Sequence, residues 1–170
     1  MRAVHVLLLA TLLSAGCASP KPVPSPPPAT SDTLPGSSYT QIEREIMHLV
    51  NLERMKTGLD TLRWNAQLDK AAKIQAVQMA AQRKMAHDLP GAGYPGLKDR
   101  IRYAGYSYRH IAENVAFGYP DAAYTVAAWM KSSGHRLNIL DRASAETGVG
   151  VARAKTGELY YCQVFGSRLY

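Results

Sequence analysis

The sequence has few cysteines: only Cys17 and Cys162 occur among its 170 residues. They form neither a CxxC pair nor part of a Cys/His zinc pattern, so a disulfide network or a zinc module is excluded as the basis of the fold. A single Cys17–Cys162 disulfide stays open at this point. The HExxH motif and the Gly-x-Ser-x-Gly element of many hydrolases are also missing. Lysine and arginine are scattered without a run, which argues against a nucleic-acid partner.

The longest apolar stretch lies at the N-terminus, over residues 4–16. It is too short for the roughly 20 residues that span a bilayer and has the form of an export signal. Small residues stand immediately before Cys17, and this pattern resembles a bacterial lipobox, whose cysteine thiol receives a diacylglycerol. We therefore predict a lipoprotein signal peptide over residues 1–16 and a lipid anchor on Cys17. The alternative is a plain secretory signal cut near Ala15 or Ala18.

A proline-rich segment follows over residues 17–38. Seven prolines fall between Pro20 and Pro35, and no apolar periodicity accompanies them. Such a segment favours extended polyproline II, which rises about 3.1 Å per residue. We predict a tether that reaches up to roughly 60 Å from the membrane.

Residues 39–170 carry the pattern of one small domain, with helices first and strands late. Thr40 and Glu43 form a capping box, and Asn65 and Asp121 are further helix N-caps. Lys155-Thr156-Gly157 separates two apolar runs and predicts a hairpin turn. The expected helices cover about 41–57, 66–87, 97–104 and 122–131, with one further turn at 135–140 after a break at Gly134; the expected strands cover 111–116, 147–154 and 158–166. This order favours an α+β sandwich over a βαβ repeat.

The same domain has 18 Lys or Arg and 12 Asp or Glu. Such an excess of positive charge suits anionic partners such as lipid headgroups or wall polymers, and equally a solvated basic surface.

Several short motifs stand in a defined order along this domain. They are Val50-Asn51-Leu52-Glu53-Arg54, Leu62-Arg63-Trp64-Asn65, His87, Ala112-Glu113-Asn114-Val115, Trp129, the block Ser133–Leu140, and Gly148-Val149-Gly150. As an ordered set they resemble the CAP superfamily of SCP-like extracellular domains, which includes cysteine-rich secretory proteins and bacterial envelope proteins. The resemblance implies a three-layer α-β-α sandwich with a C-terminal β-hairpin and, without disulfides, the bacterial lipoprotein branch.

The family often places two histidines and two glutamates around a central cleft. By motif, His87, Glu113 and His135 match three of these, and Ser132 stands where the second glutamate is expected. Asn114 and Ser132 are the other candidate cleft residues. Two imidazoles and a carboxylate can bind a divalent metal such as zinc, or act as base and orienter. They can equally form a hydrogen-bonded network that only stabilises the fold.

The leading hypothesis is a lipid-anchored extracytoplasmic protein that binds a lipid, glycan or envelope protein without turnover. A metal-assisted hydrolase using His87, Glu113 and His135 is the alternative. We expect a monomer held at the membrane through Cys17, in the periplasm or outer membrane of a Gram-negative cell, or at the surface of another.

Overall fold

The computed structural model describes residues 40–169, so the predicted signal peptide, Cys17 and the tether lie outside the described residues. The elements in chain order are α1 (Gln41–Lys56), β1 (Arg63–Trp64), α2 (Ala66–Gln82), α3 (Leu97–Ala104), β2 (Tyr108–Phe117), α4 (Ala122–Lys131), α5 (Ser133–Ile139), β3 (Glu146–Arg153) and β4 (Leu159–Arg168). None of the helices within these residues combines the length and apolarity needed to cross a bilayer.

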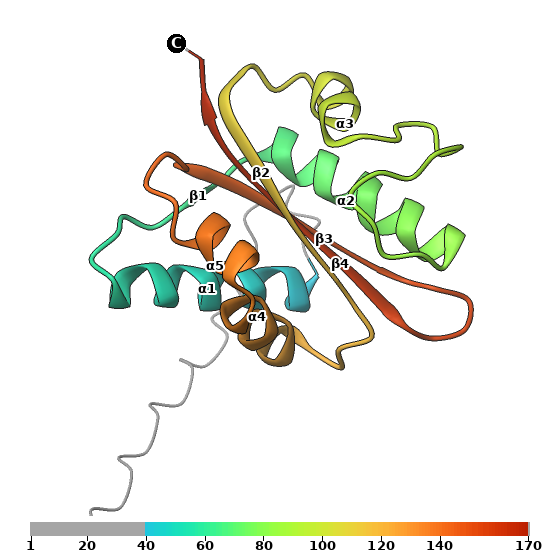
Figure 1. Ribbon diagram of the computed structural model, residues 1–170, viewed down its shortest axis with the longest axis horizontal. Helices are drawn as coiled ribbons and strands as arrows, with labels where there is room; N and C mark the ends of the chain where they lie inside the picture. The colour runs from blue at the N-terminus through green and yellow to red at the C-terminus, as the bar shows by residue number, and fades with distance from the viewer. Residues whose placement is uncertain (1–39, 170) are drawn as a thin grey trace, which may run out of the picture. The chain divides into compact units, whose positions relative to one another are not determined.

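A four-stranded sheet in the order β1-β3-β4-β2 forms the middle layer. Strand β4 pairs antiparallel with both β3 and β2, while β1 pairs parallel with β3. Helices α2 and α3 cover one face of the sheet, and α1, α4 and α5 cover the other (Figure 1). The predicted α+β sandwich with a C-terminal hairpin is therefore confirmed.

Strand β4 serves both hydrophobic cores of the sandwich. Cys162 and Val164 lie in the core beneath α2 and α3, whereas Tyr161 and Phe165 lie in the core beneath α1 and α4. Side chains alternate between the two faces of a strand, so a strand covered on both faces is apolar at nearly every position. This explains the continuous apolar run near the C-terminus.

The three predicted N-caps are confirmed. Thr40 and Glu43 exchange both hydrogen bonds of a capping box at the start of α1. The Asn65 side chain accepts from the amides of Gln67 and Leu68, and the Asp121 side chain accepts from the Tyr124 amide. Each satisfies backbone donors that a helix start leaves without intrahelical partners.

Helix α2 ends at Gln82, five residues before the predicted end at His87. Arg83 adopts a left-handed conformation with φ of 50° and terminates the helix. The chain then turns back along α2, where the buried Gln75 Nε2 donates to the Ala86 and His87 carbonyls at 2.5 and 3.2 Å. A long-range side-chain contact, invisible to helix periodicity, sets this boundary.

Three other expectations need correction. Gly134 lies inside α5 and does not break a helix; the break comes at Ser132, whose backbone is extended. Strand β2 starts at Tyr108, ahead of the predicted Ile111, because it pairs along nearly all of β4 with a register shift at its start. The two-residue strand β1 was not predicted, since nothing but its pairing with β3 defines it.

The outer edge of β2 is covered by side chains from the α4–α5 segment. Trp129 Nε1 donates to the Val115 carbonyl at 3.1 Å, and Asn138 Nδ2 donates to the Glu113 carbonyl at 3.2 Å. These two carbonyls point away from β4 and would otherwise lack partners in the sheet. Trp129 itself is buried.

Arg54 connects the end of α1 to two irregular segments. Its side chain is buried, and its guanidinium donates to the carbonyls of Asp60, Ile139, Asp141 and Ser144 at 2.7–3.2 Å. A buried guanidinium needs acceptors for its N–H groups, and here backbone carbonyls supply them. Arg54 therefore fixes both loops at this end of the domain.

Helix α2 packs unusually close to β3 because two glycines face it. A Cβ atom at Gly148 would overlap the Asp69 backbone nitrogen, and one at Gly150 would overlap the backbone around Lys73. Alanines at positions 71, 72 and 76 on the facing side of α2 are fully buried and permit the same close approach. Since backbone atoms cannot move aside as a flexible side chain can, even one methyl group is too large here.

We expect Gly148→Ala to lower the free energy of unfolding by about 3 kcal/mol or more, because α2 must shift away from the sheet. Gly134→Ala is the matched control: its Cβ would meet nothing within 4 Å. Replacing a helical glycine should leave stability unchanged or raise it by up to about 1 kcal/mol. Urea denaturation followed by circular dichroism measures both, and equal stabilities for the two variants would contradict the close packing.

Candidate functional site

Two of the three predicted cleft residues are in direct contact. His87 lies in the segment after α2 and Glu113 lies in β2, and His87 Nδ1 is 2.9 Å from Glu113 Oε1. The Glu113 side chain is only 2% exposed, whereas the His87 side chain is 56% exposed. Glu113 thus forms the buried floor of the site and His87 its solvent-facing side. The ring orientation leaves Nε2 of His87 as the outward nitrogen.

The structure adds Arg100 of α3, which the sequence analysis missed. Its guanidinium is fully buried and donates to Glu113 Oε2 at 2.8 Å. It also donates to the carbonyls of Tyr94, Pro95 and His87 at 3.0–3.3 Å. Arg100 therefore neutralises Glu113 and holds the loop that carries His87. The signal was present: Arg100 occupies a core-facing position in the helical periodicity of Leu97 and Ile101.

Cys162 completes the surroundings of Glu113. It is fully buried, and its Sγ lies 3.3 Å from Glu113 Oε2. Burial, and then the negative charge of Glu113, raise the pKa of the Cys162 thiol well above its ordinary value. A neutral buried thiol is a poor nucleophile, so Cys162 is an inert part of the site.

The remaining candidates surround this cluster through α5. Asn114 is buried in β2; its Nδ2 donates to the His135 carbonyl at 3.0 Å, and its Oδ1 accepts from Asn138 at 2.8 Å. The two asparagines therefore join strand β2 to helix α5. Ser132 is half-buried between α4 and α5, and its side chain makes no capping bond. It provides no substitute for the missing carboxylate.

The two histidines have opposite electrostatic environments. The hydrogen bond to Glu113 raises the pKa of His87, and burial opposes this to a lesser degree. Burial lowers the pKa of His135, and the nearby His87 lowers it further. Near neutral pH, His87 is therefore the imidazole that carries a proton more readily, and His135 is the neutral one.

A divalent metal does not fit these residues as they are arranged. Both oxygens of Glu113 are already engaged, and the cation Arg100 lies 2.8 Å from one of them. Within residues 40–169, no group of three or more His, Cys, Asp or Glu side chains has the spacing needed to hold a metal ion. We therefore derive no metal-dependent step from this site.

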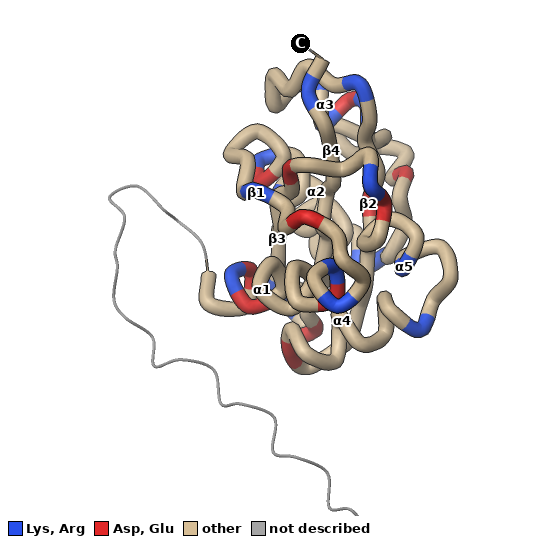
Figure 2. The backbone as a smooth tube through the Cα atoms, turned by 90° about the vertical axis from the view of Figure 1, so that its left-hand side faces the viewer, with Lys and Arg blue, Asp and Glu red and all other residues tan. Residues whose placement is uncertain are grey.

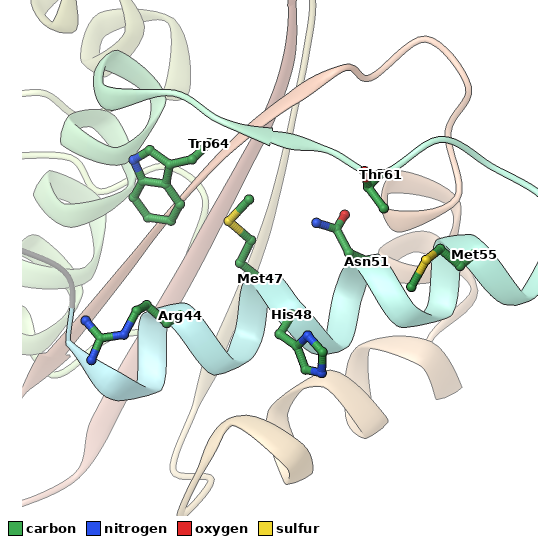
Figure 3. A pocket seen from close by; sticks show the side chains of 7 residues that line it. All are labelled: Arg44, Met47, His48, Asn51, Met55, Thr61 and Trp64. Carbon is green, nitrogen blue, oxygen red and sulfur yellow. The ribbon is translucent and has the colours of Figure 1, made fainter. Parts of the chain in front are cut away.

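A separate hollow of about 420 Å³ lies on the outer face of α1, away from these residues. Its lining residues are Arg44, Met47, His48, Asn51, Met55, Thr61 and Trp64 (Figure 3). Asn51 is not free to bind a ligand there, because its side chain exchanges hydrogen bonds with both backbone groups of Leu62.

Comparison with known proteins identifies the family. The model of the cysteine-rich secretory protein family, CAP, matches residues 47–165. The chain belongs to this family. The uncharacterized protein YkwD of Bacillus subtilis is 33% identical over 144 residues, which make up 82% of this chain and 54% of YkwD. The chain spans about half or less of the length of the curated relatives that it matches.

Solved structures show the same CAP fold. An extracellular protein from Bacillus anthracis that contains an SCP domain has a TM-score of 0.67 and 26% identity, over 74% of this chain and 40% of that one. An outer surface protein from Borrelia burgdorferi has a TM-score of 0.68 and 22% identity, over 74% of this chain and 92% of that one. The second likeness concerns the fold alone.

In this CAP domain, removing one partner of the Arg100–Glu113 pair should leave a buried charge uncompensated. We expect Arg100→Met to lower the free energy of unfolding by about 3–5 kcal/mol. Arg102→Met is the control in the same helix, because its side chain is 81% exposed, and it should change stability by less than about 0.5 kcal/mol. Urea denaturation of these variants measures the difference.

The double variant Arg100→Met/Glu113→Gln completes the test. It should be more stable than the sum of the two single losses, with a coupling of about 1–3 kcal/mol. Strictly additive losses would mean that the two side chains do not interact.

The His87–Glu113 contact should also be visible in an NMR titration. We expect His87 to titrate above about 6.5 and His135 below it, and Glu113→Gln to lower the His87 midpoint. A raised folded-state pKa means that the contact stabilises the fold fully below about pH 6.5 and loses this contribution as the pH rises through the folded pKa. If Glu113→Gln left the His87 midpoint unchanged, burial alone would set it.

Proposed function

We propose that this CAP-domain protein is an extracytoplasmic lipoprotein that binds an envelope component without chemical turnover. The ligand site is the face formed by His87 and His135. One observation carries the proposal: the only carboxylate of the cluster formed by His87, Arg100, Glu113 and Cys162 is buried and bound on both oxygens.

A general base must reach the proton that it removes, directly or through one water. Glu113 is 2% exposed and lies behind His87, so it orients the imidazole and does not meet a substrate. Its tightest partner, Arg100, is fully buried. These contacts suit a rigid binding face more than a hydrolytic centre.

The charge of the face indicates the ligand chemistry. Arg100 balances Glu113, so a proton on His87 adds an uncompensated positive charge next to the half-buried His135. An anionic group of a lipid, glycan or envelope protein would be favoured there, such as a phosphate or carboxylate. The outward nitrogen of His87 would donate the hydrogen bond.

The location outside the cytoplasm rests on the signal-like N-terminus and Cys17, and on relatives of the same fold. The Bacillus anthracis relative is described as extracellular, and the Borrelia burgdorferi relative as an outer surface protein. A lipidated Cys17 would anchor the chain stably, since each buried CH₂ adds about 0.8 kcal/mol. The proline-rich segment would then hold the domain away from the bilayer.

We expect the full-length lipidated protein, dispersed in detergent, to cosediment with cell-wall sacculi from the producing bacterium and to release no soluble fragments from them. The double variant His87→Ala/His135→Ala should bind at least about tenfold more weakly, because the hydrogen-bond donors to an anion are lost. His48→Ala is the control, since His48 is exposed on α1. Wall fragments released by the native protein and absent with the double histidine variant would reverse the conclusion in favour of a hydrolase.

The anchor is tested in the same cells with an alkyne-labelled fatty acid. The native chain should carry the label and stay in the membrane fraction, and Cys17→Ala should do neither. A Cys17→Ala protein that is still labelled would rule out this lipidation site.

A further inference from the structure

The outer face of α2 carries a regular stripe that none of the site chemistry uses. Lys70, Ile74, Val77 and Ala81 follow each other at intervals of four and three residues, so they share one face of the helix, and Lys84 lies just beyond its end. Val77 is 58% exposed. Lys70, Ala81 and Lys84 are also exposed, and Ile74 is half-buried. Basic residues thus stand at both ends of an exposed apolar surface.

A shallow groove runs beside this stripe. It has a volume of about 500 Å³ and is lined by Lys70, Ile74, Val77 and Tyr94, among others. Tyr94 stacks on Tyr103 of α3 with ring centroids 4.1 Å apart, and Lys70 Nζ lies 4.2 Å above the Tyr103 ring. We call the surface formed by Lys70, Ile74, Val77, Tyr94 and Tyr103 the α2 groove.

The wall of the α2 groove is held in place. Gln78 of α2 exchanges two hydrogen bonds with the backbone of Tyr94, each 3.0 Å long. Tyr103 is 50% exposed although it stacks on Tyr94. The two rings therefore form a fixed amphipathic surface, with apolar faces and hydroxyl groups that can stay in water.

Positive charge is concentrated in the layer that carries the α2 groove. Residues 66–104 contain seven Lys or Arg and three Asp, and six of the seven remain when the buried Arg100, paired with Glu113, is left out. Residues 41–56 of α1 contain three Lys or Arg and three Glu. Of the three aspartates, Asp69 is buried and Asp99 lies 3.7 Å from Arg102. Figure 2 shows both signs of charge side by side along α1. The layer of α2 and α3 therefore has the stronger attraction for an anionic surface.

The start of the described chain is linked to this groove. The Thr40 amide donates to Glu43 Oε2 at 2.8 Å, and the same oxygen lies 3.7 Å from Lys73 Nζ, which lines the hollow. The described chain therefore begins with α1, in the helix layer on the opposite face of the sheet, and the Lys73 side chain links this point to the groove across the β3 edge, where Glu43 also accepts from the Val151 amide.

We propose that the α2 groove docks on the anionic headgroups of the membrane that holds the lipid anchor. This rests on the proposed anchoring at Cys17. Lysines at both ends of the stripe contact phosphates, Ile74 and Val77 enter the headgroup boundary, and the tyrosine pair lies at the interface. Tethering makes the contact intramolecular, so even a weak surface suffices. Docking would place the domain in contact with the bilayer, and not at the distance that an extended tether allows.

The experiment uses the full lipidated protein in vesicles, with an environment-sensitive fluorophore on Ala81→Cys. The lipid consumes the Cys17 thiol, and the Cys162 thiol is fully buried, so the new cysteine is labelled selectively. With roughly one-third anionic lipid we expect a blue shift and protection from an aqueous quencher, both reversed by about 1 M salt. A label on Ala127→Cys of α4, in the other helix layer, should show neither.

Lys70→Glu/Lys84→Glu should reduce the docked-to-free ratio at least about tenfold. Lys56→Glu/Lys131→Glu makes the same change in net charge on exposed residues of the other helix layer and should leave the ratio nearly unchanged. An anchored protein with no blue shift at position 81 would overturn the docking, as would an equal effect of both charge variants. A shift in neutral vesicles that grows with protein density would assign the groove to a second copy of the chain. If the protein fails to enter the vesicles through a lipid, the anchor itself is wrong.

Discussion

A guanidinium ion taken out of water must find acceptors for its N–H groups, and this domain buries two of them. Arg54 meets the requirement with four backbone carbonyls. Arg100 meets it at its two terminal nitrogens, with three carbonyls and Glu113, while its buried Nε has no hydrogen-bond partner among the described residues. Apart from Ile139 at the end of α5, these carbonyls belong to irregular segments that have no ladder of their own. Fixed positions for these loops, which a disulfide could provide in another protein, follow here from the need to satisfy buried charge.

The same requirement shapes the candidate site. Glu113 offsets the free-energy cost of burying the charge of Arg100. Because it is buried together with Arg100 for this purpose, it cannot also be an exposed base. What reaches solvent is the imidazole of His87, with its inner nitrogen fixed by Glu113 and its backbone carbonyl fixed by Gln75 and Arg100. The buried Arg100–Glu113 pair thus stabilises the fold and also fixes the orientation of His87. This explains why the site is ordered although Ser132 stands where the family has a second glutamate.

Features set by neighbouring residues could be predicted from the sequence, and features set by distant contacts could not. The caps at Thr40, Asn65 and Asp121 and the hairpin turn at Gly157 depend on residues within a few positions, and all are found as expected. The end of α2 and the strand β1 depend on partners far along the chain. The family motifs indicated His87 and Glu113 correctly, but Arg100 lies outside those motifs, and only its place among apolar residues could have indicated that it is buried.

The covered edge of β2 has a consequence for how copies of the domain coexist. Trp129 and Asn138 are bonded to its outward carbonyls, so the β2 side of the sheet offers no long open ladder. On the opposite side β1 covers only the start of β3, and Glu43 accepts from the Val151 amide further along that strand. Chains held by the proposed anchor would be confined to two dimensions, where local concentrations are high and encounters are frequent. The covered β2 edge would remove one route by which such crowded copies recruit each other's strands into a continuous aggregate.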